Sequence, residues 1–107
     1  MKDKVKNLKL KFKKAKQSFY FVYESVELAL SGKQDLSYTA KHHLFQYQVL
    51  LVSNKYLLEK YEEEISKLKE ESTTEKEYEY ICSVLDNLIT DHQAKSISID
   101  NILRNHL

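Results

Sequence analysis

The most informative stretch covers residues 44–58 and reads Leu44-Phe45-Gln46-Tyr47-Gln48-Val49-Leu50-Leu51-Val52-Ser53-Asn54-Lys55-Tyr56-Leu57-Leu58. Read as a helix, it is apolar on two opposite sides. One side carries Leu44, Tyr47, Leu51 and Leu58, widened by Leu50 and Leu57. The other side carries Phe45, Val49, Val52 and Tyr56, at i, i+4, i+7 and i+11. A helix in a small bundle needs one apolar stripe, so the second stripe predicts a second contact. That contact is another helix of this chain, a second copy or a different protein.

Composition points to one helical domain over residues 1–107. There is no proline and a single glycine, and 31% of the residues are charged, mostly Lys and Glu, which favour helices. The 17 basic and 16 acidic residues nearly cancel, so no whole-molecule attraction to nucleic acid or membrane is implied. Cys82 is the only cysteine, and the sequence contains neither a long apolar run nor a secretory signal. We therefore expect a cytoplasmic protein.

Alternating spacings of three and four residues predict a first helix over residues 2–31 with a coiled-coil-like seam. Its seam positions are Val5, Leu8, Phe12, Ala15, Phe19, Val22, Val26 and Ala29. Gly32 is placed to end this helix in a left-handed conformation, and Lys33, Gln34 and Asp35 complete a short connection. Asp35 or Ser37 can cap the next helix.

A second helix is predicted over residues 36–71. Its seam consists of Ala40, Leu44, Tyr47, Leu51, Asn54, Leu58, Tyr61, Ile65 and Leu68. Asn54 is the polar member of this seam. One interpretation is that Asn54 fixes the helix register or the number of partners at a cost in stability. The other is that it lies partly solvated at the edge of the seam. The sequence supports both interpretations equally.

A third helix opens where Thr74 and Glu77 match a capping box, with Ser72 and Glu75 as a competing match. Its seam is Tyr78, Ile81, Leu85, Leu88, His92, Ile99 and Ile102. Because this seam weakens over residues 92–98, the helix either continues past Lys95 or bends, with a short fourth helix from Ser96 or Ser98 to Leu107. The expected fold class is all-α: an antiparallel up-down-up three-helix bundle with coiled-coil-like seams, with or without the fourth helix.

The charges agree with that topology. Residues 1–16 hold eight lysines against one acid, Asp3, and residues 59–79 hold nine glutamates against four lysines. In an antiparallel bundle the basic start of the first helix lies beside the acidic end of the second and the acidic start of the third. We expect the two blocks to neutralise each other, with each exposed pair contributing about 0.2–1 kcal/mol.

The candidate partner-binding residues lie in one half of the expected bundle. Antiparallel pairing brings the end of the first helix level with the first half of the second, and Tyr is enriched at protein interfaces. The set comprises Tyr20, Phe21, Leu28, Phe45, Val49, Val52 and Tyr56. The alternative is complete coverage of these residues by the third helix and a fourth one.

The lysine-rich first helix gives an alternative site for anions. Lys6, Lys9, Lys13 and Lys16 flank its apolar seam, as in basic helices that lie on membranes or contact phosphates. Against this interpretation, the acidic block is expected alongside, and Arg104 is the only arginine, the residue that most often reads bases. Intramolecular pairing is therefore the favoured interpretation, and nucleic acid and membrane surfaces are the less favoured partners.

Metal, cofactor and catalytic sites are not expected. His42 and His43 are adjacent, so on a helix they point about 100° apart. The chain has no Glu-x-x-His pair of the di-iron kind and no glycine-rich phosphate loop. Cys82 is expected to be a structural thiol, and His92 a seam residue satisfied by solvent or a neighbour.

The segment from Asn54-Lys55-Tyr56 through Tyr61-Glu62-Glu63-Glu64-Ile65-Ser66-Lys67-Leu68 resembles the middle of small bacteriocin immunity proteins. The resemblance implies a cytoplasmic helical bundle, but this chain stays charged to its end, without the glycine-containing tail of those proteins. From the residues themselves we expect a non-enzymatic interaction module, either a homo-oligomer or a small adaptor, inhibitor or immunity-type factor. The alternatives are an immunity-like protein and an electrostatic binder.

Overall fold

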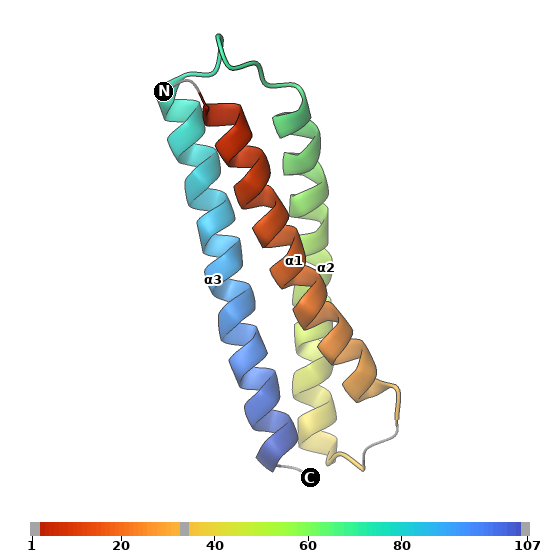
Figure 1. Cartoon of the computed structure of the whole chain (residues 1–107). Helices are drawn as coiled ribbons and strands as arrows, with labels where there is room; N and C mark the ends of the chain where they lie inside the picture. Colours follow the sequence, from red (N-terminus) through yellow and green to blue (C-terminus); the bar gives the residue numbers. More distant parts are fainter. Residues whose placement is uncertain (1–2, 33–34, 106–107) are drawn as a thin grey trace.

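The computed structural model describes residues 3–32 and 35–105. They form three α-helices: α1 (Lys4–Leu30), α2 (Tyr38–Ser66) and α3 (Glu75–Asn105). The helices run up, down and up in one bundle of 55 × 19 × 17 Å (Figure 1). The predicted all-α three-helix bundle is therefore confirmed.

Helix α1 holds the bundle together, because it packs along both other helices while α2 and α3 approach each other less (Figure 1). Seven of its eight predicted seam residues are buried, and Phe12 is half-buried. From α2 the core receives Ala40, Leu44, Leu51, Leu58, Tyr61 and Ile65. The heptad-like seams of the sequence are thus the buried faces of these two helices.

Local signals set the boundary between α1 and α2. Ser31 closes α1 by donating its backbone N–H to the carbonyls of Glu27 and Leu28. Gly32 follows with φ = +93°, the left-handed conformation predicted for it. Ser37 then caps α2, because its hydroxyl oxygen accepts the N–H of Ala40 at 3.1 Å.

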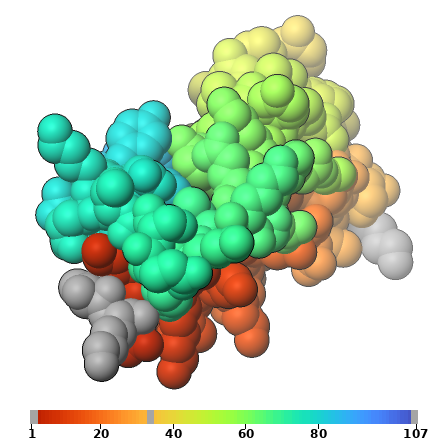
Figure 2. All heavy atoms as spheres, turned by 90° about the horizontal axis from the view of Figure 1, so that it is seen from above, coloured from red at the N-terminus to blue at the C-terminus, as the bar shows by residue number. Residues whose placement is uncertain are grey.

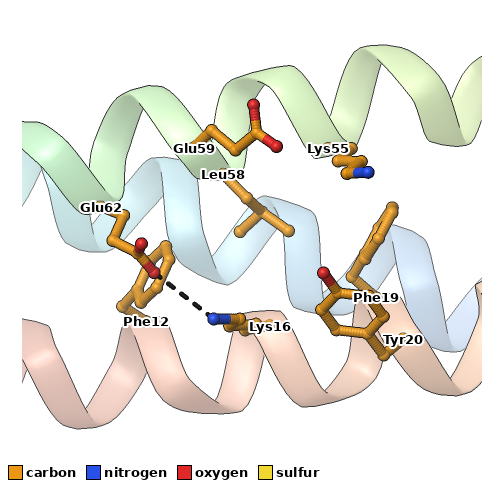
Figure 3. Close-up of a pocket in the computed structure, with 8 residues that line it drawn as sticks. All are labelled: Phe12, Lys16, Phe19, Tyr20, Lys55, Leu58, Glu59 and Glu62. Atoms are coloured by element: carbon orange, nitrogen blue, oxygen red, sulfur yellow. Dashed lines mark ion pairs between the residues drawn. The ribbon is translucent and has the colours of Figure 1, made fainter.

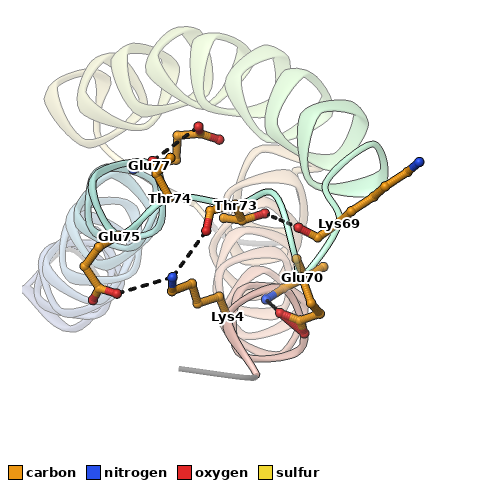
Figure 4. Close-up of polar contacts among 8 residues, drawn as sticks. Lys4, Lys69, Glu70, Thr73, Thr74, Glu75 and Glu77 are labelled. Atoms are coloured by element: carbon orange, nitrogen blue, oxygen red, sulfur yellow. Dashed lines mark hydrogen bonds and ion pairs between the residues drawn. The ribbon is translucent and has the colours of Figure 1, made fainter.

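Helix α2 ends at Ser66, earlier than the predicted residue 71, because the following backbone folds into tight turns. The N–H groups of Lys67 and Leu68 bond three residues back, at 3.2 and 3.1 Å. The N–H and hydroxyl of Thr73 both donate to the carbonyl of Lys69 (Figure 4). These bonds replace the continuation of the helix.

The turn over residues 67–74 also completes the start of α1. Asp3 makes no side-chain cap there. Instead, the Glu70 carboxylate accepts the N–H of Val5 at 2.7 Å and that of Lys6 at 3.3 Å. Viewed end-on, the turn covers this end of the bundle next to the first residues of α1 (Figure 2). The α2–α3 connection therefore supplies the cap that α1 lacks.

Of the two capping boxes predicted for α3, the one with Thr74 forms. The Thr74 hydroxyl oxygen accepts the Glu77 N–H at 3.1 Å, and the same hydroxyl donates to the Glu77 carboxylate at 3.2 Å. The competing start at Ser72 is wrong, since Ser72 lies in the preceding turn.

Helix α3 is continuous to Asn105, so the bend and the short fourth helix from Ser96 or Ser98 are wrong. The reason is Lys95, which is buried between His92 and Ile99 and fills the gap in the seam. The buried positions of α3 then repeat at alternating spacings of four and three: Ile81, Leu85, Leu88, His92, Lys95 and Ile99.

Several expectations concern residues outside the described ranges: the helix start at Lys2, the connection residues Lys33 and Gln34, and the chain end at Leu107. Within the described ranges, no helix combines the length and the apolar character that crossing a bilayer requires.

Candidate functional site

The outward side of α2 carries a row of exposed apolar side chains. Phe45, Val49, Val52 and Tyr56 are 52%, 68%, 64% and 70% exposed, respectively; we call these four residues the outer α2 face. On the opposite side of the same helix Leu44, Leu51 and Leu58 are buried in the core, whereas Leu50, which the sequence pattern assigned to that side, is 50% exposed. The alternative expectation, that the chain covers this stripe itself, is wrong.

The other three predicted partner-binding residues are also exposed, but they lie on different faces. Tyr20 lines a hollow between α1 and α2 (Figure 3). Phe21 lines hollows between α1 and α3, together with Ile97, and shares a further hollow along α1 with Tyr20. Leu28 lies seven residues after Phe21, on the same side of α1. The seven residues are therefore exposed without forming one continuous surface.

The hollow at Tyr20 borders the outer α2 face. Phe12, Phe19 and Leu58 contribute its apolar lining, and the ion pair between Lys16 and Glu62, at 3.5 Å, lies across it (Figure 3). Its rim also includes Lys55 and Glu59 of α2. Its volume is about 160 Å³, below the roughly 300–1,000 Å³ of small-molecule pockets. The hollow is thus of a size for a single inserted side chain.

The predicted neutralisation of the basic first helix is present only in part. Lys4 pairs with Glu75 at 3.5 Å and also donates to the carbonyl of Thr73 (Figure 4), and Lys16 pairs with Glu62. A further pair, between Lys11 and Asp86 at 2.9 Å, lies beyond the predicted acidic block. The hydrogen bond from Lys11 to Asp86 raises the pKa of the lysine.

Three of the four candidate anion-binding lysines remain outside these pairs. Lys6, Lys9 and Lys13 are exposed, and none forms an ion pair with another described residue. They line one hollow together with Leu10, whose side chain is 55% exposed. The fourth, Lys16, is held by Glu62.

A polar cluster lies inside the bundle and links all three helices. His92 of α3 is fully buried, and its Nδ1 lies 2.9 Å from the hydroxyl of Ser18 on α1. Its Nε2 lies 3.1 Å from the Nδ2 of Asn54 on α2, which also donates to Asp91 at 3.3 Å. Lys95 donates to the same Asp91 oxygen. We call Ser18, Asn54, Asp91, His92 and Lys95 the polar cluster.

The hydrogen bonds define one protonation state of His92. An amide nitrogen can only donate, so Nε2 accepts from Asn54. Nδ1 therefore carries the proton and donates to Ser18, whose own hydroxyl donates to the carbonyl of Ala15 at 2.9 Å. The imidazole is neutral, with both nitrogens engaged.

Burial lowers the pKa of His92; the nearby Asp91 charge acts in the opposite direction, and Lys95 lowers it further. Burial alone would raise the pKa of Asp91. The hydrogen bond and charge of Lys95, with the Asn54 hydrogen bond, outweigh that effect, so the Asp91 pKa lies below its ordinary value. The cluster is thus arranged around a neutral histidine and an ionised aspartate.

Sequence reasoning placed Asn54 and His92 in the seams but missed Lys95. The sequence does contain a signal for the burial of this lysine. Lys95 falls between His92 and Ile99 at the expected seam spacing and lies four residues after Asp91. Asn54 bonds to Asp91 and His92 of α3 and is also partly exposed, so features of both interpretations are present. In the described chain every buried side-chain nitrogen or oxygen has a hydrogen-bond partner.

The described residues contain no group of three or more His, Cys, Asp or Glu side chains suited to a metal ion. Cys82 is a free, half-buried thiol. Comparisons with known proteins give no further direction, because no family model, curated protein or solved structure matches this chain.

Proposed function

We propose that this chain is a non-enzymatic protein-binding module and that its docking surface is the outer α2 face. One observation carries the proposal: four apolar side chains, each more than half exposed, follow one another along a helix whose other side is already filled. Contiguous exposed apolar surface on a small domain marks an interaction site more often than not. A homo-oligomer, an adaptor, an inhibitor and an immunity-type factor all fit this class.

The surroundings of the outer α2 face support docking of a protein. Phe45 and Tyr56 stand at its two ends, and aromatic residues are enriched at interfaces because they bury a large area with few rotatable bonds. The adjoining hollow can receive one side chain of a partner (Figure 3). The exposed apolar residues Phe21, Leu28 and Ile97 form a second patch, which is divided between α1 and α3.

The polar cluster does not offer a competing chemical site. His92 is fully buried, and its two ring nitrogens are taken by Ser18 and Asn54. A general base must reach a substrate proton at about 2.6–3.2 Å, directly or through one water. The closed hydrogen bonds favour a structural role for this histidine.

Site-specific photo-crosslinking in the cells that make the protein tests the proposal. A photoreactive amino acid replaces Val52, and in a matched control it replaces Thr90, an exposed polar residue of α3. We expect a discrete protein adduct from position 52 and none from position 90. No adduct at position 52, or the same adducts at both positions, would reject the outer α2 face as a docking surface.

A second candidate function rests on the lysines that have no ion pair with a described residue. Lys6, Lys9 and Lys13 surround the exposed Leu10, as in helices that lie on anionic surfaces. This proposal predicts binding to duplex DNA or to phosphatidylserine vesicles that falls steeply as salt rises. It also predicts that Lys9→Glu/Lys13→Glu weakens binding while Lys14→Glu does so less. Absence of binding even at low salt would eliminate it.

A further inference from the structure

The outer α2 face has the same composition read from either end. Its residues are an aromatic ring, a valine, a valine and an aromatic ring, at spacings of four, three and four, from Phe45 to Tyr56. The midpoint lies between Leu50 and Leu51. A surface that contacts its own copy across a two-fold axis must be self-complementary, with residue i touching j and j touching i.

Antiparallel pairing of two α2 helices about that midpoint satisfies this condition. Phe45 then lies against Tyr56 of the second copy, and Val49 against Val52 of the second copy. Each contact occurs twice, once on either side of the axis. All four exposed side chains of the outer α2 face are therefore buried together, without help from a residue elsewhere in the chain.

Charges beside the face are complementary to those of a second copy in the antiparallel direction. Lys41 and Glu59 are both exposed and lie eighteen residues apart, five helical turns, so they share one edge of the outer α2 face. Neither forms an ion pair with another described residue. Antiparallel pairing places Lys41 beside Glu59 of the second copy, twice. Parallel pairing about a two-fold axis brings opposite edges together, so it would place Lys41 beside His42 and Glu59 beside Lys60 of the second copy.

His42 and Lys60 lie on the opposite edge, also eighteen residues apart, and antiparallel pairing brings them together without an attractive pair. The charge complementarity of the antiparallel arrangement therefore rests on Lys41 and Glu59. The paired region from 41 to 59 is about 27 Å long at 1.5 Å per residue, roughly half of the 55 Å bundle.

We infer that the partner of the outer α2 face is a second copy of this chain, paired antiparallel through α2 about the point between Leu50 and Leu51. This inference rests on the proposed function, since it names the occupant of the same surface. It leaves the Phe21, Leu28 and Ile97 patch outside the dimer contact.

A charge-reversal series tests the pairing. The dissociation constant of the wild-type dimer is measured by sedimentation equilibrium, with those of Lys41→Glu, Glu59→Lys and the double variant. Each single change turns two attractive contacts into two repulsive ones, so we expect about a tenfold weaker dimer at low salt. The double variant restores opposite charges and should return to within about twofold of the wild type. Circular dichroism verifies that every variant keeps its helicity.

Disulfide trapping reports the direction independently. In a Cys82→Ala background, chains with Phe45→Cys are mixed with chains with Tyr56→Cys and oxidised. Antiparallel pairing gives mixed disulfides between positions 45 and 56. Like positions 45 and 45 would then be eleven residues apart, about 16 Å, beyond the roughly 7 Å reach of a disulfide. A predominance of 45–45 and 56–56 links would overturn the antiparallel arrangement.

The outcomes separate this inference from the proposed function. A wild-type chain that stays monomeric up to high concentration overturns the second-copy inference. If position 52 then crosslinks to a different protein in cells, the docking surface stands and its occupant is foreign. An adduct of twice the chain mass, with rescue in the double charge variant, supports both. A dimer that the double variant fails to restore overturns the pairing through Lys41 and Glu59.

Discussion

The Nε2 atom of His92 on α3 lies 3.1 Å from the amide nitrogen of Asn54 on α2, inside the bundle. These two helices otherwise approach each other least, because α1 lies against both. The contact therefore fixes how α2 and α3 align along their lengths. An apolar pair at the same place would tolerate sliding, whereas a donor and an acceptor must face each other.

Replacing Asn54 with alanine should destabilise the fold. The change removes the donor to both His92 and Asp91 and leaves the buried Nε2 atom of His92 unsatisfied, at a cost of about 1–3 kcal/mol. Urea unfolding of Asn54→Ala measures the loss in the free energy of unfolding. Gln46→Ala, at an exposed position of the same helix, is the control and should stay within about 0.5 kcal/mol of the wild type. Equal stability of both variants would contradict the structural role of Asn54.

Stability should fall as the medium becomes acidic, and His92 should cause the first part of the fall. Its pKa in the folded protein lies below 6.5, because burial disfavours the imidazolium form. As the pH drops below 6.5, the unfolded chain binds a proton there that the folded chain does not, so the free energy of unfolding decreases. The loss from His92 ends once the pH passes its folded pKa. Asp91, with its lowered pKa, adds a further loss below pH 3.8.

The contribution of His92 can be isolated with His92→Gln, which cannot titrate but keeps polar atoms in place. Urea unfolding between about pH 7.5 and pH 5 brackets the ordinary histidine pKa. The free energy of unfolding of the wild type should decline over this range more steeply than that of the variant. Identical slopes would show that His92 is not the titrating group.

Changing Val49 and Val52 together to glutamate should abolish association and leave the fold intact. Both side chains are more than 60% exposed, so the charges remain in water in the monomer but would be buried without partners in a complex. Light scattering measures the solution mass, and circular dichroism measures the helicity and the melting temperature.

Thr39→Glu/Gln46→Glu is the matched control, because it adds the same charge at two exposed polar positions of α2. It should leave association unchanged. Leu51→Ala, on the buried side of α2, should instead cost about 2–5 kcal/mol of stability. If Val49→Glu/Val52→Glu lowers the stability of the fold as much as Leu51→Ala does, the outer α2 face would belong to the core.

Removing the Glu70 carboxylate should loosen the start of α1. Glu70→Ala leaves the N–H groups of Val5 and Lys6 without their acceptor, so we expect a loss of about 0.5–2 kcal/mol in the free energy of unfolding. Hydrogen exchange at Val5 should accelerate. Glu71→Ala, one residue away and exposed, keeps the cap. Similar losses in both variants would mean that net charge, rather than capping, is responsible.

The buried faces of α1 and α2 could be predicted because their apolar residues keep one spacing throughout. The continuity of α3 could not be predicted, because a lysine at a seam position suggests that the apolar seam is interrupted there. Lys95 can be buried because its ammonium group pairs with Asp91, one turn earlier, while its alkyl stem packs inside the bundle. The end of α2 could not be predicted either, because the bond between the Glu70 carboxylate and the backbone of Val5, 65 residues earlier, leaves no local sequence pattern.

The exposure of the outer α2 face could be predicted from the sequence, because two opposed stripes on one helix cannot both face the same core. The sequence could not predict that Tyr20 lies toward α2 and Phe21 toward α3. Adjacent residues point about 100° apart, and which neighbour each one meets depends on how α1 is rotated between α2 and α3. That rotation is set by packing around Phe19 and Val22, both buried, and not by the seam alone.

The cap of α1 has a consequence for how the chain is made. Glu70 lies 65 residues after Val5, whose N–H it accepts. A ribosome synthesises the protein from its first residue, so α1 leaves the exit tunnel with the N–H groups of its first turn uncapped. The turn after α2 must be synthesised before that first helix can be finished. The first turn of α1 is thus one of the last parts of the bundle to reach its final state.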